Sequence, residues 1–547
     1  MPACFFALAK FMFIHYNASL FRFQRLLLYG IVVTMKENNI NNRYIMKDRK
    51  EEYIRNIVLF VFVLLIGCLS ISSHSLWMDE ALRVGYSNIS VEDGYFERSW
   101  INLHVGLVHY MYAWGQLFGT SEVAFRSMNL PFLMIAAVYM VKMLRSFGVS
   151  SWWVLLFVAH PLTVYYMNDA GPYIALMGCA CAVTYHSLLA KNLNSLWNTA
   201  AIFAWMLLGF SMHFTFGFVG VIYLYSLALR LYRGRKWSIF LRDCAVAIPF
   251  IPALLYVAWM YLVNMPDGKQ IGMEPPGVLN IATVGYCFSG LAGLGIPRND
   301  MKSAGVLAIT PVMISLVSVF CVSLLVLLTT NLRFLWQQIK RNHVLFATSA
   351  VAVLFFVGSF IKGFRFWERH VIFLFPVFFL LLAIIFQRAC QKRGSWVSRI
   401  AFVLIAGLLL TSSSRLRWYE PYRKDDYKSM ILHLKEEGLL NGSIPVLAQG
   451  DFWVYNYYGI SFAEENLVIY PDCVCGVMKG SAEHLLHMVD EISRYHGRIC
   501  LILHQQKSKT PQLYQNAEAV FKQKGYNVTC NSQFNTFKVL TLERALR

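Results

Sequence analysis

Two adjacent acids, Asp79 and Glu80, follow a long apolar segment near the start of this 547-residue chain. Charged side chains at a membrane boundary are costly to remove from water, so a cluster of them is a candidate site. Neighbouring residues cannot point the same way on a regular element, so the two carboxylates can divide roles. Asp79 could be the general base for an acceptor hydroxyl, while Glu80 supports a metal ion or a backbone group. The structural alternative is an ordinary N-cap, and the residues alone favour neither interpretation.

Two further polar clusters stand between apolar runs. The segment Asn168-Asp169-Ala170-Gly171-Pro172-Tyr173 contains Gly-Pro, which indicates a turn, and Asp169 is more simply explained as a helix cap. His213 stands at a tight junction, where a lone histidine is more often a satisfied polar residue than a ligand. If His213 lies at the same membrane level as His104 and the acids, its neutral imidazole would suit a divalent cation.

A basic and aromatic run, Lys362-Gly363-Phe364-Arg365-Phe366-Trp367-Glu368-Arg369-His370, precedes a late apolar segment. Guanidinium groups suit bidentate binding of a phosphate, so Arg365 and Arg369 are candidate donor-binding residues. The neighbouring aromatics suit the boundary between lipid headgroups and acyl chains. The alternative is an interfacial anchor with snorkelling side chains, and we favour phosphate binding.

The elements that must position these clusters are mostly membrane helices. The chain is 57% hydrophobic and 14% charged, with a mean hydropathy of +0.48. A soluble domain has roughly 25% charged residues, so much of the chain is predicted to lie in lipid. The net charge is +19, but from Arg415 onward 16 Lys and Arg face 14 Asp and Glu. The positive excess therefore lies in the N-terminal stretch and the short loops, which is topology bias and gives no reason to expect a nucleic-acid partner.

Apolar runs of about 17–25 residues predict about eleven transmembrane helices. We place them near 57–73, 125–143, 151–167, 173–190, 197–212, 214–230, 243–263, 305–330, 344–361, 370–387 and 399–414. Lys and Arg concentrate in alternate loops, which puts the N-terminus in the cytoplasm and the loops 74–124 and 264–303 outside. Val105–Phe118 is apolar but short, and counting it as a span would invert this pattern. We therefore expect it to be a juxtamembrane or re-entrant helix.

These elements define three regions. Residues 1–54 are predicted to be a cytoplasmic N-terminal segment. We favour an over-extended start, with translation beginning at Met35 or Met46, over the alternative of an additional helix in this stretch. Residues 55–415 are the predicted transmembrane domain. Residues 416–547 are predicted to be an extracytoplasmic α/β domain on a parallel sheet, because strands alternate with helices. The expected helices are 426–439, 482–495 and 511–524, and the expected strands are 444–448, 467–470, 499–504 and a closing pair in 526–541. With no Gly-rich phosphate loop, a docking or lid role is expected for this domain.

Four cysteines lie in this last region: Cys473, Cys475, Cys500 and Cys530. In an oxidising compartment they could form one or two disulfides. The pair Cys473-Val474-Cys475 could also bind a metal, but two cysteines without histidine spacing are weak evidence for that.

The order of the clusters resembles the GT-C superfamily of membrane glycosyltransferases, in the bacterial branch related to protein O-mannosyltransferases and the aminoarabinose transferase of lipid A. The matching segments are Trp77-Met78-Asp79-Glu80-Ala81, Leu103-His104-Val105-Gly106-Leu107, Leu117-Phe118-Gly119, Ser121-Glu122 with Arg126, Tyr166 to Tyr173, Met212-His213-Phe214, and Arg369-His370 with Pro376. The resemblance covers nearly everything from about 55 to 470 and implies a GT-C-like fold. Two departures stand out. Both prolines after His104 are missing, and Gly171 stands where the family has an arginine, which would weaken a phosphate or carboxylate contact there.

Carried over residue by residue, the resemblance implies that Asp79 is the acceptor-activating base and that Asp169 lies near the reacting centre. It also implies His213, with Glu80 or His104, as ligands of a divalent metal cation. Tyr173 closes the matched turn motif, and we expect it beside the phosphate of the donor.

The sequence thus predicts a glycosyltransferase in a bacterial inner membrane. It would move a sugar from a polyprenyl-phosphate donor to a lipid, polysaccharide or protein acceptor on the outer face. Nucleotide sugars are cytoplasmic, so no nucleotide cofactor is expected there. One alternative is a transporter or flippase of lipid-linked glycans, which paired charges buried within helices would favour. The other is a catalytically decayed GT-C-like partner protein, which Gly171 keeps open.

Overall fold

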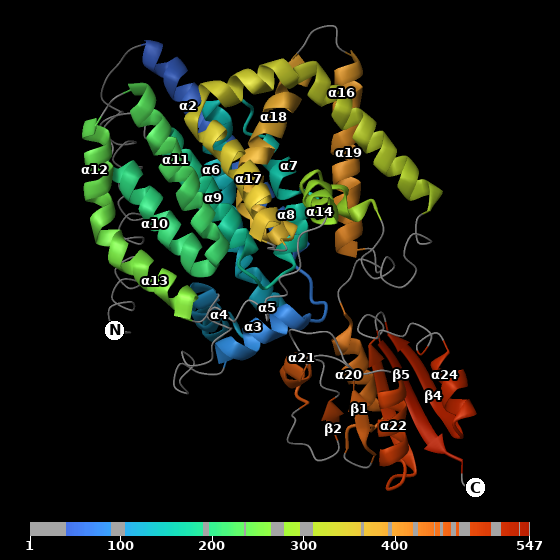
Figure 1. Cartoon of the computed structure of the whole chain (residues 1–547). Coiled ribbons are helices and arrows are strands. Elements are labelled where there is room, and N and C mark those ends of the chain that lie inside the picture. The colour runs from blue at the N-terminus through green and yellow to red at the C-terminus, as the bar shows by residue number, and fades with distance from the viewer. Residues whose placement is uncertain are drawn as a thin grey trace. The chain divides into compact units, whose positions relative to one another are not determined.

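The computed structural model describes residues 40–88, 104–189, 196–234, 237–263, 278–295, 310–362, 366–391, 396–418, 425–441, 444–448, 452–460, 467–469, 482–504, 513, 516–534 and 537–545. Two compact units are distinguished, Met1–Val61 and Phe62–Arg547. The first contributes the start of helix α2 (Ile40–Ser70). The second holds the remaining helices and a C-terminal sheet (Figure 1).

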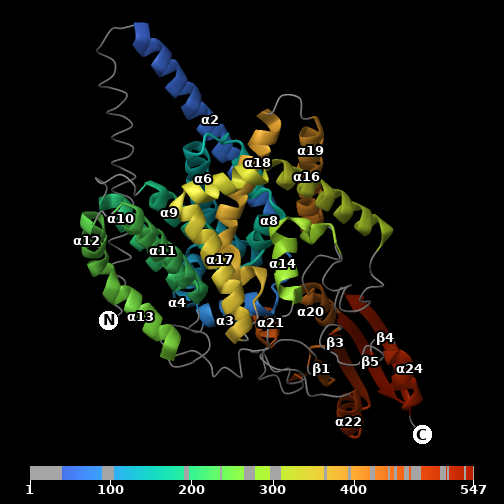
Figure 2. The same cartoon turned by 45° about the horizontal axis from the view of Figure 1, so that its top comes forward.

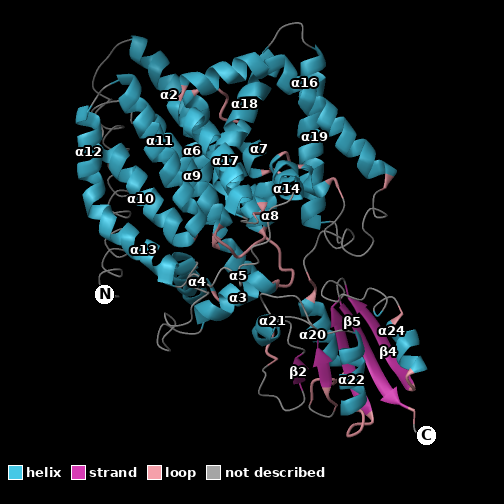
Figure 3. Cartoon of the chain, in the orientation of Figure 1, coloured by secondary structure: helices cyan, strands magenta, loops and turns pink. Residues whose placement is uncertain are grey.

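Seven described helices are long and apolar enough to cross a membrane, which takes about 20 residues. They are Glu52–Ser70, Glu122–Ser146, Phe240–Leu262, Pro311–Arg341, His343–Ile361, Glu368–Gln391 and Trp396–Trp418, and three shorter apolar helices are Tyr173–Leu188, Leu196–Met212 and Phe214–Leu229. The chain is therefore a multi-pass membrane protein, as predicted. Helices make up nearly all of the described chain before the C-terminal sheet (Figure 3). The predicted number of eleven spans stays a prediction.

Helix α9 is buried along almost its whole length and packs against α6. Small residues allow this approach, because a Cβ at Gly178 on α9 would lie 2.8 Å from the carbonyl oxygen of Phe132 on α6. The helices of this region are α6 (Asn129–Ser146), α9 (Tyr173–Leu189), α10 (Leu196–Met212), α11 (Gly217–Gly234), α12 (Trp237–Ala247), α13 (Ile251–Val263), α16 (Pro311–Arg341), α17 (His343–Lys362), α18 (Phe375–Gln391) and α19 (Trp396–Trp418).

The predicted span 151–167 is wrong as a single helix. The structure has two short helices there, α7 (Trp153–Val158) and α8 (Pro161–Met167). Pro161 has no backbone N–H to continue the helix, and the Nδ1 atom of His160 accepts a hydrogen bond from Leu162 N to begin the second one. The apolar composition of the run hid this break.

Three described helices lie between α2 and α6: α3 (Met78–Asn88), α4 (Val105–Phe118) and α5 (Glu122–Ser127), the last of which begins the span Glu122–Ser146. Helix α4 has 14 residues and is too short to cross a bilayer, in agreement with the juxtamembrane or re-entrant interpretation. A further short helix, α14 (Val278–Phe288), lies in the region expected to be a loop and was not predicted.

The C-terminal region forms a five-stranded sheet in the order β2-β1-β3-β5-β4. Figure 2 labels four of these strands, β1, β3, β5 and β4. The strands are β1 (Val446–Ala448), β2 (Leu467–Ile469), β3 (Arg498–His504), β4 (Tyr526–Phe534) and β5 (Phe537–Arg544), and the helices are α20 (Tyr427–Glu436), α21 (Phe452–Tyr457), α22 (Ala482–Ile492) and α24 (Ala517–Gln523). Leucines and other apolar side chains of α22 and α24 pack against β3 and β5. Every predicted strand is present, whereas α21 was not predicted.

The expectation of a parallel sheet is corrected to a mixed one. Strand β1 pairs parallel to β2 and β3, but β5 pairs antiparallel to both β3 and β4. Only two residues separate β4 from β5, and so short a connection forces a hairpin. The Thr541 position of β5 lies between Cys500 and Cys530, and both cysteines are free thiols. Cys473 and Cys475 lie outside the described residues.

Candidate active site

Helix α3 carries both acids in its first turn, where the positive end of the helix dipole favours carboxylates. The two side chains have different environments. Glu80 is fully buried, whereas the side chain of Asp79 is 21% exposed. Adjacent positions thus place one carboxylate inside the protein and the other at the edge of the site.

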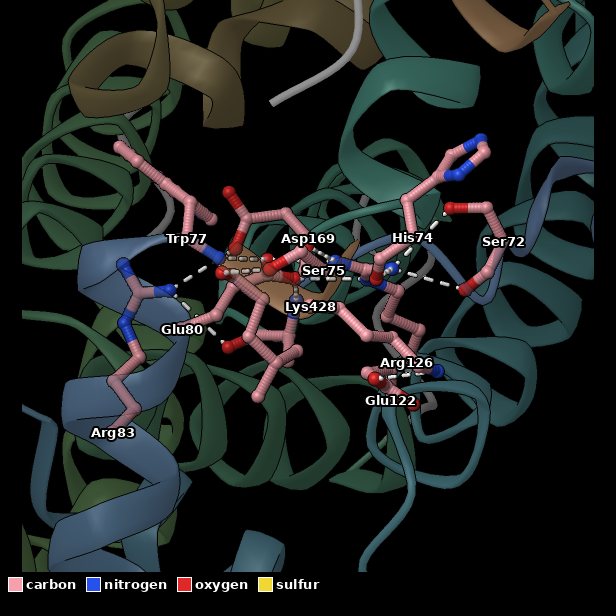
Figure 4. Close-up of polar contacts among 12 residues, drawn as sticks. Ser72, His74, Ser75, Trp77, Glu80, Arg83, Glu122, Arg126, Asp169 and Lys428 are labelled. Atoms are coloured by element: carbon pink, nitrogen blue, oxygen red, sulfur yellow. Dashed lines mark hydrogen bonds and ion pairs between the residues drawn. The ribbon is translucent and has the colours of Figure 1, made fainter. Parts of the chain in front are cut away.

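Glu80 forms a buried, two-bond ion pair with Arg126 of α5 (Figure 4). Arg126 Nε lies 3.0 Å from one carboxylate oxygen and Nη2 lies 2.8 Å from the other. The same guanidinium donates to three backbone carbonyls in the extended segment 71–77, which leads into α3. Glu80 Oε1 also accepts the backbone N–H of Ala170 at 2.8 Å. These contacts favour the backbone-supporting role for Glu80 over metal binding.

Two arginines and two acids alternate beside this pair. Arg369 Nη1 lies 2.9 Å from Asp79 Oδ2, and Arg83 Nη2 lies 4.0 Å from the same oxygen. Arg83 Nη1 in turn lies 3.0 Å from Asp169 Oδ1. The order Arg369–Asp79–Arg83–Asp169 joins three segments that are far apart in the sequence. Asp169 is 1% exposed, so Asp79 is the more accessible of the two acids.

The turn that carries Asp169 is held from both sides. Asn129 Nδ2 on α6 donates to the Asp169 carbonyl at 2.8 Å. Tyr166 donates its hydroxyl to Glu368 Oε1 at 2.9 Å, which ties the turn to the short helix η9 (Glu368–Leu374) that carries Arg369. Tyr173 begins α9, and its hydroxyl accepts from Arg83 Nη2 at 3.3 Å.

Three histidines gather near these charges. The ring centroids of His104 and His213 are 4.8 Å apart, and those of His213 and His370 are 6.3 Å apart. Burial, with the nearby charge of Arg83, lowers the pKa of His104 to about 3, so this ring is neutral at physiological pH. His104 Nδ1 donates to the Met212 carbonyl, which leaves Nε2 of the neutral ring as an acceptor.

The predicted metal ligands do not fit a metal site in this arrangement. His213 Nδ1 accepts the backbone N–H of Thr215, so the proton of its neutral ring lies on Nε2, which can donate but not ligate. Both oxygens of Glu80 are bonded to Arg126. Within the described part of the chain, no group of three or more His, Cys, Asp or Glu side chains could hold a metal ion. Metal dependence therefore stays a prediction.

The structure thus brings together Asp79, Glu80, Asp169, Tyr173, His104, His213 and Arg369, while Arg365 lies outside the described residues. Sequence reasoning did not identify Arg83 or His370 as site residues. Arg83 stands four residues after Asp79, a spacing that places both on one helix face and could have indicated it. His370 Nδ1 accepts the backbone N–H of Trp367, and no spacing rule would have revealed that contact.

Comparison with solved structures finds a similar fold in the crystal structure of ArnT from Cupriavidus metallidurans in the apo state. The TM-score is 0.51 at 12% sequence identity, over 90% of this chain and 98% of that one. No family model and no curated sequence relative matches this chain. The likeness shows the fold, and the predicted architecture of a polytopic helical membrane protein with a small C-terminal α/β domain is confirmed.

Proposed function

We propose that this protein transfers a sugar from a polyprenyl-phosphate donor to an acceptor hydroxyl on the outer face of a bacterial inner membrane. The observation that carries the proposal is the contact of Arg369 with Asp79 at 2.9 Å, between positions 290 residues apart. A base and a phosphate-binding cation side by side are what displacement of a lipid phosphate needs. The fold shared with ArnT supports a lipid-linked sugar as donor.

The reaction is a direct displacement at the anomeric carbon. Asp79 removes the proton of the acceptor hydroxyl, and the acceptor oxygen forms a bond to the anomeric carbon. The bond between that carbon and the phosphate oxygen breaks, and polyprenyl phosphate leaves with the electron pair. Arg369 stabilises the charge that grows on the leaving phosphate. The phosphate competes with Asp79 for Arg369, so donor binding frees the carboxylate to act as a base.

The remaining side chains bind and orient. In this proposal the Tyr173 hydroxyl and the Nε2–H of His213 donate hydrogen bonds to the donor headgroup. Asp169 is buried and ion-paired, so it positions its neighbours and does not take the proton. The acyl chain of the donor lies among the apolar helices, and the Lys and Arg distribution puts this end of the helices outside the cytoplasm.

Transfer of a labelled sugar from a polyprenyl-phosphate donor tests this function. The assay uses the purified full-length protein and extracted envelope lipids, polysaccharides and proteins as acceptors. Removing the base in Asp79→Asn should lower transfer about 100- to 10,000-fold, the usual contribution of a general base. Glu491→Gln is the matched control, because this exposed acid of the C-terminal region contacts only His487 in the structure's described ion pairs and should keep full activity.

Two outcomes would overturn the proposal. Full activity of Asp79→Asn removes the assigned base. Net movement of the intact lipid-linked sugar across vesicles, without formation of polyprenyl phosphate, would replace the transferase with a transporter.

A further inference from the structure

Gly171 has no side chain, and the guanidinium of Arg83 lies against the position that a Cβ at residue 171 would take. A Cβ at position 171 would lie 2.8 Å from Nη1 of Arg83, 2.9 Å from Oδ1 of Asp169 and 3.1 Å from the ring of Tyr173. Real Cβ atoms essentially never approach another heavy atom to less than 3.0 Å. Gly171 is not among the glycines with positive φ, so its backbone does not demand glycine. A side chain at position 171 would therefore displace the Arg83 guanidinium and the Asp169 carboxylate from their present positions.

The Arg83 guanidinium is turned toward protein acceptors. Its Nη1 donates to Asp169 Oδ1 at 3.0 Å and to the Ala170 carbonyl at 3.2 Å, which uses both hydrogens of that nitrogen. Its Nη2 donates to the Tyr173 hydroxyl at 3.3 Å and faces Asp79. The residue is 6% exposed. It therefore has little capacity left for a substrate phosphate.

We infer that Arg83 is a positioning residue for sugar transfer, and that Gly171 is required because it admits the Arg83 guanidinium. Arg83 fixes Asp169 and Tyr173, and it lies 4.0 Å from the same Asp79 oxygen that Arg369 contacts. This inference rests on the proposed function and assigns a role that the resemblance of the turn to other proteins does not give.

The variants Gly171→Ala, Arg83→Lys and Arg83→Gln, with the double variant Gly171→Ala/Arg83→Gln, test the inference in the sugar-transfer assay. A displacement of about 1 Å in a positioning group costs on the order of 100-fold in rate. We therefore expect Gly171→Ala to lower kcat by about 10- to 100-fold while the donor KM changes less than about threefold, because ground-state binding is kept. Gly285→Ala is the matched control, since a Cβ there meets nothing within 4 Å.

Coupling between the two positions distinguishes positioning from general disruption. In the Arg83→Gln background the added methyl no longer meets a guanidinium, and Asp169 Oδ1 is no longer held in place by Arg83 Nη1. Gly171→Ala should therefore change kcat less than about twofold further. Arg83→Lys keeps the positive charge but loses the planar set of N–H donors of the guanidinium. Its kcat should therefore lie between the kcat values of wild type and Arg83→Gln. Rates are expressed per folded protein, measured by size-exclusion chromatography and thermal unfolding, so that loss of fold is not counted as loss of catalysis.

Three results would overturn the inference. They are wild-type kcat in Gly171→Ala, additive effects in the double variant, or a lower unfolding temperature with unchanged kcat per folded protein. An active wild type whose Arg83 variants also remain fully active defeats only this inference. A wild type that transfers no sugar defeats the proposed function, and the positioning role with it.

Discussion

Arg83 and Arg369 both lie beside the carboxylate of Asp79, but the two arginines differ in how deeply they are buried. The side chain of Arg83 is 7% exposed and that of Arg369 is 31% exposed. A buried guanidinium whose hydrogens point at protein acceptors orders its neighbours, whereas an exposed one can exchange a carboxylate for a phosphate. In the proposed reaction, Arg83 would therefore hold the acids and Arg369 would bind the donor phosphate.

Arg126 gives a stability prediction for the buried pair beneath the site. Its loss in Arg126→Met leaves the carboxylate of Glu80 without the ion pair, and breaking a buried pair costs about 3–5 kcal/mol. We expect a clearly lower free energy of unfolding in detergent-solubilised protein. Lys522→Met, which removes an exposed pair with Glu518, is the control and should unfold like wild type. Equal stability of the two variants would show that the segment 71–77 does not depend on Arg126.

Side chains that follow apolar runs could be predicted from sequence, because charge at a membrane boundary stands out against its surroundings. Asp79, Asp169 and Arg369 belong to this group. Arg83 was overlooked because its importance comes from a partner 86 residues away. The role of Glu80 could not be predicted from sequence. An acid at that position is equally suited to support a metal ion or a backbone group. Only the fold shows Arg126 in contact with both of its oxygens.

Among the elements, the short helix α21 links the C-terminal region to the segment that carries the acids. Directly after α21, the hydroxyl of Tyr458 accepts the backbone N–H of Leu76 at 3.0 Å and donates to Glu122 Oε1 at 3.1 Å. Burial raises the pKa of Tyr458, so this hydroxyl stays protonated and able to donate. This contact lies three residues before Asp79 and connects the C-terminal region to the segment that carries the acids. The docking or lid role expected for the C-terminal region stays a prediction.

Tyr458→Phe removes these hydrogen bonds and leaves the ring in place. Loss of one such bond costs about 0.5–1.5 kcal/mol, so sugar transfer should fall about 2- to 10-fold as the segment before α3 loosens. Limited proteolysis should also release the C-terminal region faster. Tyr495→Phe is the control, because Tyr495 is 83% exposed. Identical transfer rates for the two variants would exclude a contribution of the C-terminal region through Tyr458.

The type of most elements followed from hydrophobic period and length, but their breaks and partners did not. The division of the 151–167 run at Pro161 was masked by apolar residues on both sides. Strand β5 runs antiparallel to β3. This direction follows from the pairing of the two strands and cannot be read from the residues of either strand alone. Local patterns give helices and strands, whereas tertiary contacts decide how they end and pair.

Across the whole molecule, a fold is retained at 12% identity to ArnT. Apolar length, small residues where helices touch and charges at helix ends are the features that such a fold requires, and many sequences supply them. Order of motifs along the chain is therefore a better guide to this architecture than residue identity. Function depends instead on the few side chains that converge around Asp79.

Steady-state kinetics of Asp79→Asn and Arg369→Gln, measured side by side with a polyprenyl-phosphate sugar, test whether these two residues act together on one lipid phosphate. We expect Asp79→Asn to lower kcat with little change in the donor KM. Arg369→Gln should raise the donor KM about 10- to 100-fold, because hydrogen bonds to a charged group contribute about 1.5–3 kcal/mol. Arg494→Gln, at an exposed position of the C-terminal region, serves as the control. Wild-type kcat and KM in both site variants would contradict a catalytic centre at this position.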